Sequence, residues 1–385
     1  MRGPSVTPFY AGDIGVRGAA RVRAGLPFVP MHYGQPSAGA PAAAIAAAHR
    51  VIDRDPLGYT ELVELRERIA RHYAEAHGLE VDPARILLTA GASAALVAAY
   101  ATMFRPGDRV AVLRPGYPAY RNTLTALNLM PVEIHCGPEQ GFHPTRAQIE
   151  ALSPAPQALL VASPANPTGA MLDATQLGEL VATCRTRGIR VISDEIYHGI
   201  SFGQRAVSAL EIDPRAVVIN SFSKLYRMPG WRLGWMVVPQ DWAARIHAVL
   251  INMFLTPSTL AQHAALAAMD EREDLERWVR IYAQNRTRLI EGLAALGIRK
   301  IVPPDGAFYL YADIGHLTRD SMQFCLRAVD ECGVGLAPGI DFDPVDGQRF
   351  VRFSFAVTPE EVEDALGRLA AWLPGYADHG AGASA

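Results

Sequence analysis

The sequence predicts an α/β protein with a three-layer, mostly parallel sheet in a large domain and a smaller α+β domain. From residue 86 onward, short apolar runs alternate with segments of helical periodicity, the pattern of strands joined by crossover helices. Polar and turn residues follow one apolar run after another, and ligands of such sheets bind beyond the carboxyl ends of the strands. Half of the 385 residues are hydrophobic, enough to enclose a large core.

The first half of the chain supplies most of the expected sheet. Residues 1–46 are rich in Gly, Pro and Ala with weak periodicity, and we expect an extended arm rather than a packed domain. Apolar residues at helical spacing predict a helix at 62–77. Strands are expected at 86–89, 109–113, 131–135, 158–162, 190–193, 216–220 and 234–238. Intervening helices are expected at 94–103, 175–187 and 241–252.

The last third of the chain predicts a second, smaller unit. The charged stretch 270–296 has the pattern of a long connecting helix. The α+β unit itself is expected to contain two strands and a closing helix, at 307–313, 349–354 and 360–373. The small, polar tail from about Gly375 is expected to be disordered.

These elements divide the chain into two domains. We expect a large domain at 47–283 and a small domain made of 1–46 and 284–385. No internal repeat is visible in the sequence.

Composition excludes several classes of protein. The net charge is only −3 and there is no run of Lys or Arg, so neither nucleic acid nor an anionic membrane is an expected partner. Apolar stretches are interrupted before about 18 residues, so no membrane-spanning helix is expected, and no signal peptide is readable. The four cysteines form no C-x-x-C pair and are expected to be free thiols in a reducing compartment. We expect a cytoplasmic protein.

Lysine usage gives the first chemical signal. Only two of the 36 Lys and Arg residues are lysines, and one of them, Lys224, lies in an apolar segment punctuated by Ser and Gly. A buried amine can lose its proton and attack a carbonyl, which an arginine cannot do. Such a Schiff-base lysine most often serves pyridoxal phosphate. A structural lysine at a strand end is the alternative from this segment alone.

The ends of the first two strands carry features that suit a phosphorylated ring. Gly91, Ala92 and Ser93 open a helix, where small residues and free N–H groups can approach an anion, although an ordinary tight turn has the same composition. Tyr117 follows the next strand and could stack on a planar ring or simply pack in the core.

The next strand ends carry polar groups that suit the rest of such a ring. Asn166 stands in a loop fixed by two prolines, where cis peptide bonds are an option, and its amide can donate to a ring oxygen. Asp194 ends a buried strand and needs a cationic partner such as a protonated pyridine, unless it caps a helix. Ser221, Ser223 and Lys224 follow the next strand, and Arg232, eight residues after Lys224, suits a phosphate.

With these segments in place, the sequence resembles the class I/II aminotransferases of the aspartate aminotransferase superfamily, the fold type I pyridoxal-phosphate enzymes. The pattern Ser-x-Ser-Lys, followed at fixed spacing by Gly-x-Arg, is highly specific. The resemblance runs over nearly the whole chain, in the segments at 32–36, 166–169, 194–197, 221–224, 230–234, 304–309 and 351–355.

The resemblance implies a role for each candidate residue. Lys224 would form the Schiff base with pyridoxal 5'-phosphate and move the proton, and Asp194 would pair with the pyridinium nitrogen. Asn166 and Tyr197 would hydrogen-bond the phenolic oxygen of the ring, and Tyr117 would stack on its face. The phosphate would be held by Ala92, Ser93, Ser221, Ser223 and Arg232. The substrate α-carboxylate would be held by Arg352, Asn166 and the backbone of Gly34.

The resemblance also implies a homodimer with shared active sites, in which Tyr59 reaches the phosphate in the neighbouring subunit. Family members usually have a few more residues, including a glycine, between the Tyr-Thr and Leu-Arg pairs than this chain has at 59–66. That departure bears on Tyr59 and leaves the other roles untouched.

The activity implied is transfer of an amino group from an L-amino acid to a 2-oxo acid by a ping-pong mechanism. Ser93 and the segment 251–254 lack the cations that some relatives use for dicarboxylates, which disfavours aspartate as donor, although one of the many other arginines could substitute. Phe9, Tyr10, His32 and Tyr33 either line a pocket for a neutral, aromatic or unusual amino acid or pack in the core.

Two other functions remain open. A β-eliminating C–S lyase on the same fold would use the same cofactor chemistry. A cofactor-sensing regulator would need a DNA-binding module, for which the segment before the first expected helix is too short and insufficiently basic.

Overall fold

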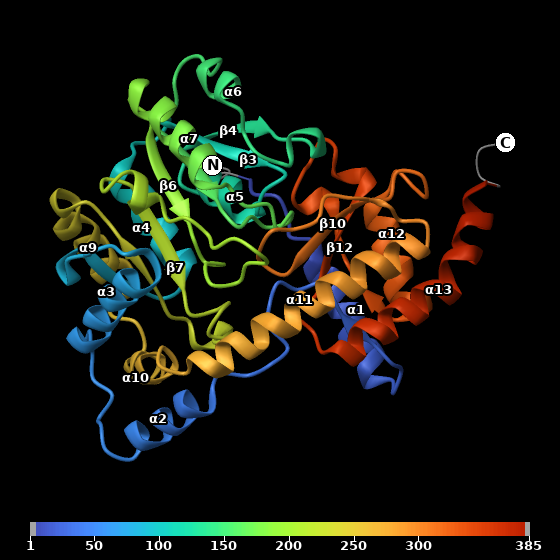
Figure 1. Ribbon diagram of the computed structural model, residues 1–385, viewed down its shortest axis with the longest axis horizontal. Helices are drawn as coiled ribbons and strands as arrows, with labels where there is room; N and C mark the ends of the chain where they lie inside the picture. Colours follow the sequence, from blue (N-terminus) through green and yellow to red (C-terminus); the bar gives the residue numbers. More distant parts are fainter. Residues whose placement is uncertain (1–4, 382–385) are drawn as a thin grey trace.

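The computed structural model describes residues 5–381 and shows two units bridged by one long helix (Figure 1). The larger unit is built on a seven-stranded sheet. Its strands are β2 (Ile86–Thr89), β3 (Arg109–Arg114), β4 (Met130–His135), β5 (Ala158–Ala162), β6 (Arg190–Asp194), β7 (Val217–Ser221) and β8 (Gly234–Val237). All seven expected strands are present, each shifted by at most one residue at either end.

The sheet has the strand order β2-β8-β7-β6-β5-β3-β4. Its strands from β7 to β4 run parallel, whereas β8 is antiparallel to both β7 and β2. Strands of a parallel sheet are covered on both faces and therefore read as continuous apolar runs. The mostly parallel α/β sheet predicted from the sequence is confirmed.

Helices cover both faces of this sheet, which gives three layers. Along β5, Leu160 packs with the helices of one face, whereas Leu159 and Val161 pack with those of the other. The first face carries α4 (Ala92–Met103), α5 (Pro118–Ala126) and α9 (Gln240–Phe254). The second carries α3 (Val63–His77), α6 (Arg146–Glu150), α7 (Ala174–Thr186), α8 (Ala209–Ile212) and α10 (Thr259–Ala268), and α2 (Ala42–Ile52) lies against α10.

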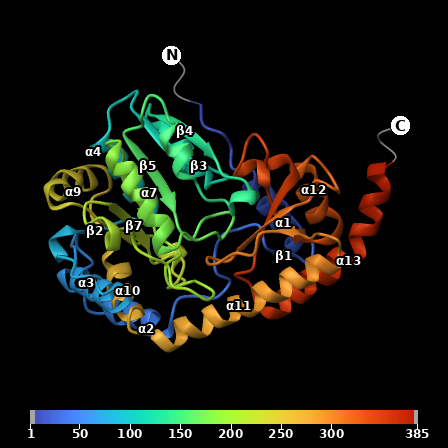
Figure 2. The ribbon, with the colours of Figure 1, turned by 45° about the horizontal axis from the view of Figure 1, so that its top comes forward.

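The smaller unit is built on a four-stranded antiparallel sheet of order β12-β13-β10-β9. Helix α11 (Arg272–Ala295) crosses from the larger unit to this one, as the charged stretch predicted (Figures 1 and 2). The strands of the small unit are β9 (Lys300–Ile301), β10 (Tyr309–Asp313), β12 (Ala337–Pro338) and β13 (Phe350–Ser354). Its helices are α12 (Ser321–Arg327) and α13 (Pro359–Ala381).

The N-terminal segment is not an extended arm, and that expectation was wrong. Helix α1 (Ala11–Arg23) packs on the smaller unit through Ala11, Ile14 and Gly18, and β1 (Val29–Pro30) pairs with β11 (Val334–Gly335). The many small residues gave this segment only weak helical periodicity in the sequence. One of them, Gly18, makes room for the ring of Phe28, because a Cβ on Gly18 would lie 2.2 Å from Cζ of Phe28.

The C-terminal tail also differs from the expectation. Helix α13 continues past Pro374 and Gly375 to Ala381, where the sequence predicted a disordered tail. Residues 382–385 of that tail lie outside the described residues.

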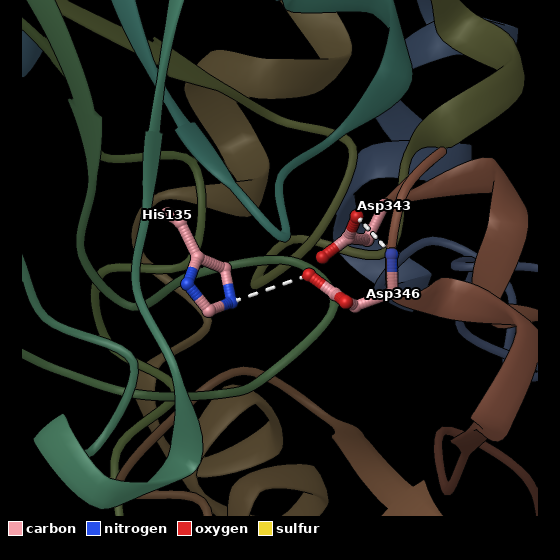
Figure 3. Close-up of side chains that lie close together, drawn as sticks. All are labelled: His135, Asp343 and Asp346. Atoms are coloured by element: carbon pink, nitrogen blue, oxygen red, sulfur yellow. Dashed lines mark hydrogen bonds and ion pairs between the residues drawn. The ribbon is translucent and has the colours of Figure 1, made fainter.

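Charged side chains of the two units meet at the edge of the large sheet, and Figure 3 shows three of them, His135, Asp343 and Asp346. Arg114, at the end of β3, donates from Nη1 to Asp343 at 2.5 Å and to Asp346 at 3.0 Å. His135, at the end of β4, places Nε2 3.6 Å from Asp346. The side chains of Arg114 and Asp343 are 12% and 4% exposed, so this pair is largely shielded from water.

Two composition-based expectations can be compared with the fold. The four cysteines Cys136, Cys184, Cys325 and Cys332 are buried and free, as predicted. Within residues 5–381, no helix combines the length and apolarity that crossing a membrane requires.

Candidate active site

One cavity collects nearly all the residues singled out in the sequence. It lies beyond the carboxyl ends of the neighbouring strands β5, β6 and β7 and encloses about 260 Å³. Residues of the smaller unit close it from the other side, among them Tyr309 and Arg352. The predicted site residues on its walls are Gly34, Ala92, Ser93, Tyr117, Asn166, Asp194, Tyr197, Ser221, Ser223, Lys224, Arg232 and Arg352.

Tyr59 is the predicted site residue that does not line this cavity. Its side chain is 82% exposed on the surface of the larger unit. Within residues 5–381, Tyr59 is thus separate from the candidate residues that line the cavity.

Lys224 follows β7 and directs its amine into the cavity. Its Nζ donates a 2.5 Å hydrogen bond to the carbonyl oxygen of Gly34 and lies 5.6 Å from the centre of the Tyr197 ring. Burial, together with the nearby cation of Arg352, lowers the pKa of Lys224 from 10.5 to about 8. About a tenth of this amine is therefore neutral at pH 7, far more than of an ordinary lysine, and the neutral form is the one that a nucleophile or base requires.

Asp194 ends β6 and is 2% exposed. Its Oδ2 accepts a 2.7 Å hydrogen bond from Tyr120, and its Oδ1 accepts one of 3.2 Å from the backbone of Ile196. Burial raises the pKa of Asp194 to about 6, and the two hydrogen bonds oppose that rise. Asp194 is the acidic residue that lines the cavity among the described residues, so it is the natural partner for a cationic ring nitrogen.

Arg352 on β13 is 1% exposed and is held by two hydrogen bonds. Its Nη1 donates to Oδ1 of Asn166 at 2.9 Å, and its Nη2 donates to the carbonyl oxygen of His32 at 2.6 Å. The guanidinium carbon stands 4.5 Å from the centre of the Tyr309 ring. A rigidly held guanidinium on a cavity wall suits a carboxylate, which it can bind with two parallel hydrogen bonds.

Hydroxyls, a helix start and an arginine come together in one corner of the cavity. Helix α4 begins at Ala92, directly after Gly91, whose φ of 81° is reserved for glycine. Ser221 Oγ donates to Ser223 Oγ at 2.8 Å. Arg232 Nη2 lies so near Gly91 that a Cβ there would stand 2.4 Å from it. Free N–H groups at a helix start, hydroxyls and a guanidinium are the groups that bind phosphate.

Cis peptide bonds shape the Asn166 loop. Ser163–Pro164 and Asn166–Pro167 are both cis, the option that the two prolines left open in the sequence. Asn166 itself is buried and lines the cavity.

Two tyrosines of the site were not identified from the sequence. Tyr120 supplies the hydroxyl that holds Asp194, and Tyr309 shares a 2.7 Å hydrogen bond with the hydroxyl of Tyr197. A Cβ on Gly34 would stand 2.0 Å from the Tyr309 hydroxyl, so Gly34 is a glycine because this ring passes against it. The available signal was the spacing of Tyr120 three residues after Tyr117, which puts both rings on one side of α5.

Comparison with known sequences assigns the chain to a protein family. The profile of the family Aminotransferase class I and II matches residues 29–369, most of the chain. The chain belongs to this family. Valine–pyruvate aminotransferase of Mycobacterium tuberculosis is 41% identical over 376 residues, covering 96% of this chain and 97% of that protein. The chain is therefore an aminotransferase, as the resemblance implied, and the β-eliminating lyase finds no support in these comparisons.

Solved structures of aminotransferases have the same fold. An aminotransferase from Mycobacterium tuberculosis has a TM-score of 0.93 at 41% identity, covering 96% of this chain and 98% of that one. The aspartate aminotransferase of Thermus thermophilus with maleate has a TM-score of 0.89 at 30% identity, covering 96% and 100%. The family is pyridoxal-phosphate dependent, and the fold type I architecture is confirmed.

Proposed function

We propose that this aminotransferase uses pyridoxal 5'-phosphate to move the amino group of an amino acid with a small neutral side chain to a 2-oxo acid. The observation that carries the proposal is the single cavity where Lys224, Asp194 and Arg352 come together. An amine of lowered pKa, a buried carboxylate and a buried guanidinium are the three groups that this chemistry needs.

The residues of the cavity fit the cofactor. Asp194 is a buried carboxylate that, among the described residues, has no cationic side chain in hydrogen-bond contact, and a pyridinium nitrogen would supply the missing cation. Arg232, Ser221, Ser223 and the start of α4 would hold the phosphate. Asn166 and Tyr197 would hold the phenolic oxygen, and Tyr117 would pack on the ring.

The mechanism assigns proton transfer to Lys224. When bound, the cofactor supplies an electron-withdrawing ring that accepts the electron pair of the α-C–H bond. Arg352 would bind the α-carboxylate, assisted by the amide of Asn166 and the backbone of Gly34, and thereby turn the α-hydrogen toward the Lys224 amine. The neutral amine would remove the proton from the substrate α-carbon and deliver it to C4′ of the cofactor. The 2-oxo product would leave before the second substrate binds, so the kinetics should be ping-pong.

The walls of the cavity support a small apolar substrate side chain. Its cations, among the residues the structure describes, are Lys224, Arg232 and Arg352, and each has a role above. A carboxylate on the substrate side chain would therefore lack a partner from this chain. Phe9, Leu96 and Ile196 also line the cavity and offer apolar contacts. The relative named valine–pyruvate aminotransferase points in the same direction.

A homodimer would complete the site. The backbone on both sides of Tyr59 is pinned, because Thr259 donates to Gly58 O at 2.7 Å and Gln262 donates to Thr60 O at 2.9 Å. A fixed backbone bearing an 82% exposed ring suits a residue that acts outside its own chain. Other large apolar side chains exposed on the larger unit include Ile45, Ile52, Leu57, Val63, Met130, Met253, Phe254 and Leu255. We infer that the surface of the larger unit around Tyr59 contacts a second copy of the chain. Tyr59 would then reach the phosphate of the cofactor bound to that second copy.

The proposed domains follow from the same geometry. We assign 47–283 to the large domain and 1–46 with 284–385 to the small domain, with the cavity between them. Arg352 then belongs to the small domain, whereas Lys224 and Asp194 belong to the large one.

Borohydride trapping tests the proposal directly. The protein is incubated with pyridoxal phosphate, reduced, digested and analysed by mass spectrometry, and the adduct is expected on Lys224. Lys224→Ala should bind the cofactor without covalent attachment and should lose nearly all amino-group transfer. Holoprotein mixed singly with L-valine, L-alanine or L-aspartate should then convert the first two faster. An unmodified Lys224 would contradict the cofactor assignment, and a preference for aspartate would contradict the substrate assignment.

A further inference from the structure

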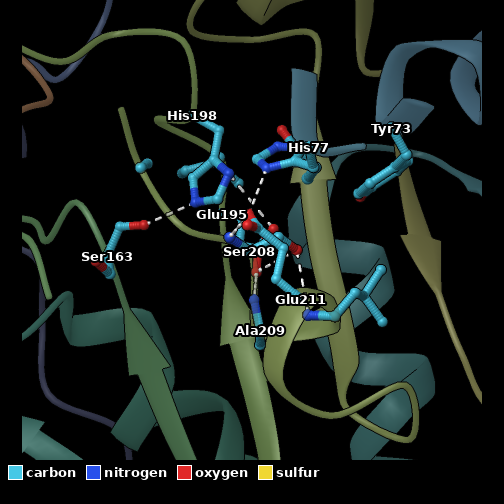
Figure 4. Close-up of polar contacts among 12 residues, drawn as sticks. Tyr73, His77, Ser163, Glu195, His198, Ser208, Ala209 and Glu211 are labelled. Carbon is cyan, nitrogen blue, oxygen red and sulfur yellow. Dashed lines mark hydrogen bonds and ion pairs between the residues drawn. The ribbon is translucent and has the colours of Figure 1, made fainter. Parts of the chain in front are cut away.

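A cluster of buried polar side chains adjoins Asp194, and the mechanism above does not use it (Figure 4). Glu195 directly follows Asp194 and is 1% exposed, and His198 lies three residues further and is 6% exposed. Both residues are in the segment after β6, and Ser163 is in the segment after β5. A polar group this deeply buried requires hydrogen-bond partners.

Only one oxygen of Glu195 is satisfied. Oε1 accepts hydrogen bonds from Ser208 Oγ at 3.1 Å and from the backbone N–H of Ala209 at 2.8 Å. Oε2 is buried and has no hydrogen-bond partner among the described residues. It faces Nδ1 of His198 at 3.5 Å.

His198 shows the complementary pattern. Its Nε2 lies 3.0 Å from the carbonyl oxygen of Ser163. A carbonyl oxygen can only accept, so Nε2 carries a hydrogen. Its Nδ1 is buried and, among the described residues, has no hydrogen-bond partner. The two unpartnered atoms of the pair therefore face each other, and one proton between them would satisfy both.

We propose that Glu195 and His198 share one proton, as carboxylic acid and neutral imidazole, and that this pair positions Asp194 and Asn166 around the cofactor. Glu195 Oε2–H donates to His198 Nδ1, and His198 Nε2–H donates to Ser163 O. This relay ties the segment bearing Asp194 to the loop from Ser163 that bears Asn166. The second half of the inference rests on the function proposed above.

The neutral form is favoured over a carboxylate–imidazolium pair. Burying two ions costs more than their attraction returns unless their geometry is excellent. The 3.5 Å separation of Glu195 Oε2 and His198 Nδ1 is longer than either a charge-assisted or a neutral hydrogen bond, so the two atoms must approach each other for the proton to bridge them. Burial raises the pKa of Glu195 to about 7 and lowers that of His198 to about 4, in agreement with a proton on the carboxyl group.

The neighbouring charges leave this assignment in place. Glu211 on α8 is held ionised, with its pKa lowered to about 2, by hydrogen bonds from Arg205 and contact with His77. From α3, the ring of His77 packs 5.5 Å from that of His198, and burial lowers the pKa of His77. On the same helix, burial lowers the pKa of His72 to about 4 and raises that of Tyr73. Burial is the largest influence on His198 and lowers its pKa to about 4, although the Ser163 carbonyl and the charge of Glu211 act in the opposite direction and the charge of Arg205 in the same one.

A neutral Glu195 also matters for Asp194 itself. The charge of an ionised Glu195 raises the pKa of Asp194, which is already raised by burial. With its proton in place, Glu195 leaves Asp194 as the single anion beside the cofactor nitrogen. Two adjacent buried carboxylates would instead compete for one positive charge.

Glu195→Gln tests where the proton lies. Its amide reproduces the protonated acid, because the oxygen accepts from Ser208 and Ala209 while the N–H donates to His198 Nδ1. The wild-type pKa is raised from 4.5 to about 7, so the wild type gains stability at low pH and loses it as pH rises through about 7. The Glu195→Gln variant lacks this dependence. Its free energy of unfolding relative to that of the wild type should therefore rise between pH 4.5 and about pH 7.

Glu211→Gln is the matched control from the same cluster. The pKa of Glu211 is lowered from 4.5 to about 2, so its contribution is constant above 4.5 and is lost only in stronger acid. Its stability relative to wild type should therefore stay level where that of Glu195→Gln rises. Equal pH dependence in the two variants would overturn the shared-proton assignment.

Nitrogen NMR of ¹⁵N-histidine-labelled full-length protein reads the pair without any enzymatic activity. His198 is assigned as the resonance missing in His198→Gln, and at about pH 6 it should show a neutral imidazole protonated on Nε2. An imidazolium signal at that pH would contradict the proposal. The result is the same with or without pyridoxal phosphate, so failure of the proposed function is registered separately, by absence of cofactor binding.

The positioning role is tested with His198→Leu, which removes the donor to Ser163 O. Displacing the Asn166 loop should weaken binding of pyridoxal phosphate and raise KM for the amino acid, each by about tenfold. Glu195→Gln should retain both constants, because it preserves the relay. His77→Leu, which changes the neighbouring ring and leaves the Ser163 contact, should also retain them. Unchanged constants in His198→Leu would show that the pair is structural only.

Discussion

The hydroxyl of Tyr120 donates a 2.7 Å hydrogen bond to Oδ2 of Asp194, deep within the protein. Burial favours the neutral form of Asp194, and this hydrogen bond favours the charged form. The charge that would hold a pyridinium nitrogen therefore depends on a tyrosine of α5, a helix on the other side of the sheet from the Glu195–His198 pair.

Tyr120→Phe should raise the pKa of Asp194 above its value of about 6. A larger fraction of Asp194 would then be protonated near neutral pH, and binding of pyridoxal phosphate should weaken by about tenfold. The pH below which cofactor binding is lost should therefore be higher in the variant than in the wild type. Raising the pH should restore binding of pyridoxal phosphate to the variant. Titration of the apoprotein with cofactor at several pH values measures both effects.

Tyr100→Phe is the matched control for this substitution. Tyr100 is buried on α4, and its hydroxyl has no hydrogen-bond partner among the described residues. Removing that hydroxyl should leave the pH dependence of cofactor binding unchanged. If both variants behave alike, the Tyr120 hydrogen bond is not what keeps Asp194 charged.

Covalent capture of the cofactor should become faster as pH rises through about 8. The reactive form of Lys224 is the neutral amine, and its pKa is lowered from 10.5 to about 8. Arg352→Gln removes a cation that contributes to this lowering, so the midpoint should move toward 10.5. The rate is measured by trapping with borohydride at timed intervals. Lys300, the other lysine of the chain, serves as the internal control for nonspecific labelling.

Arg352→Lys should separate substrate binding from cofactor binding. Lysine keeps the charge but cannot make both the Asn166 and the His32 hydrogen bonds of the guanidinium. Losing a bidentate, charge-assisted contact should raise KM for the amino acid by about 100-fold. The affinity for pyridoxal phosphate should change little. Arg349→Lys is the control. Arg349 directly precedes β13 and pairs with Asp313 away from the cavity, so this substitution should leave KM unchanged.

The ion pairs of Arg114 with Asp343 and Asp346 predict a stability effect. Arg114→Ala leaves Asp343, 4% exposed, without its cationic partner and should lower the free energy of unfolding by about 3 kcal/mol. Arg146→Ala removes the exposed Arg146–Glu150 pair and should have no measurable effect. Denaturant unfolding of both variants, compared at constant m-value, decides between them. Equal stabilities would show that the contact between the two units contributes nothing.

The parts that the sequence predicted share a physical reason. Strands covered on both faces must be continuously apolar, and the polar residues that follow them stand out against that background, as Asp194 does after β6. Lys224 was visible because arginine replaces lysine almost everywhere else. Such contrasts are local, so a single sequence displays them.

The parts that it missed depend on contacts between distant segments. In helix α1, Gly18 admits the ring of Phe28 and Gly15 lies against the side chains of Tyr33 and His32, contacts that a local sequence pattern does not show. Tyr309 and Gly34 explain each other only once β10 and the loop after β1 are adjacent. The hydrogen bond of Tyr120 to Asp194 spans 74 residues of sequence, and no local pattern marks it.

Gly91→Ala should damage the phosphate corner specifically. Gly91 has a φ of 81° and a ψ of 170°, a combination that is essentially confined to glycine, and a Cβ there would lie 2.4 Å from Nη2 of Arg232. The guanidinium must therefore move away from the start of α4. Binding of pyridoxal phosphate should weaken by about tenfold or more, because a charged contact is lost. Pyridoxal without its phosphate should bind the variant and the wild type equally.

Backbone strain alone is controlled by Gly78→Ala. Gly78 ends α3 with a φ of 66°, and nothing lies within 4 Å of the position its Cβ would take. This substitution also forces alanine into left-handed backbone and should cost about 1 kcal/mol of stability. It displaces no side chain, so the affinity for the phosphorylated cofactor should be retained. If Gly78→Ala weakened cofactor binding as much as Gly91→Ala, global destabilisation would explain both, and Arg232 would have no specific part in holding the phosphate.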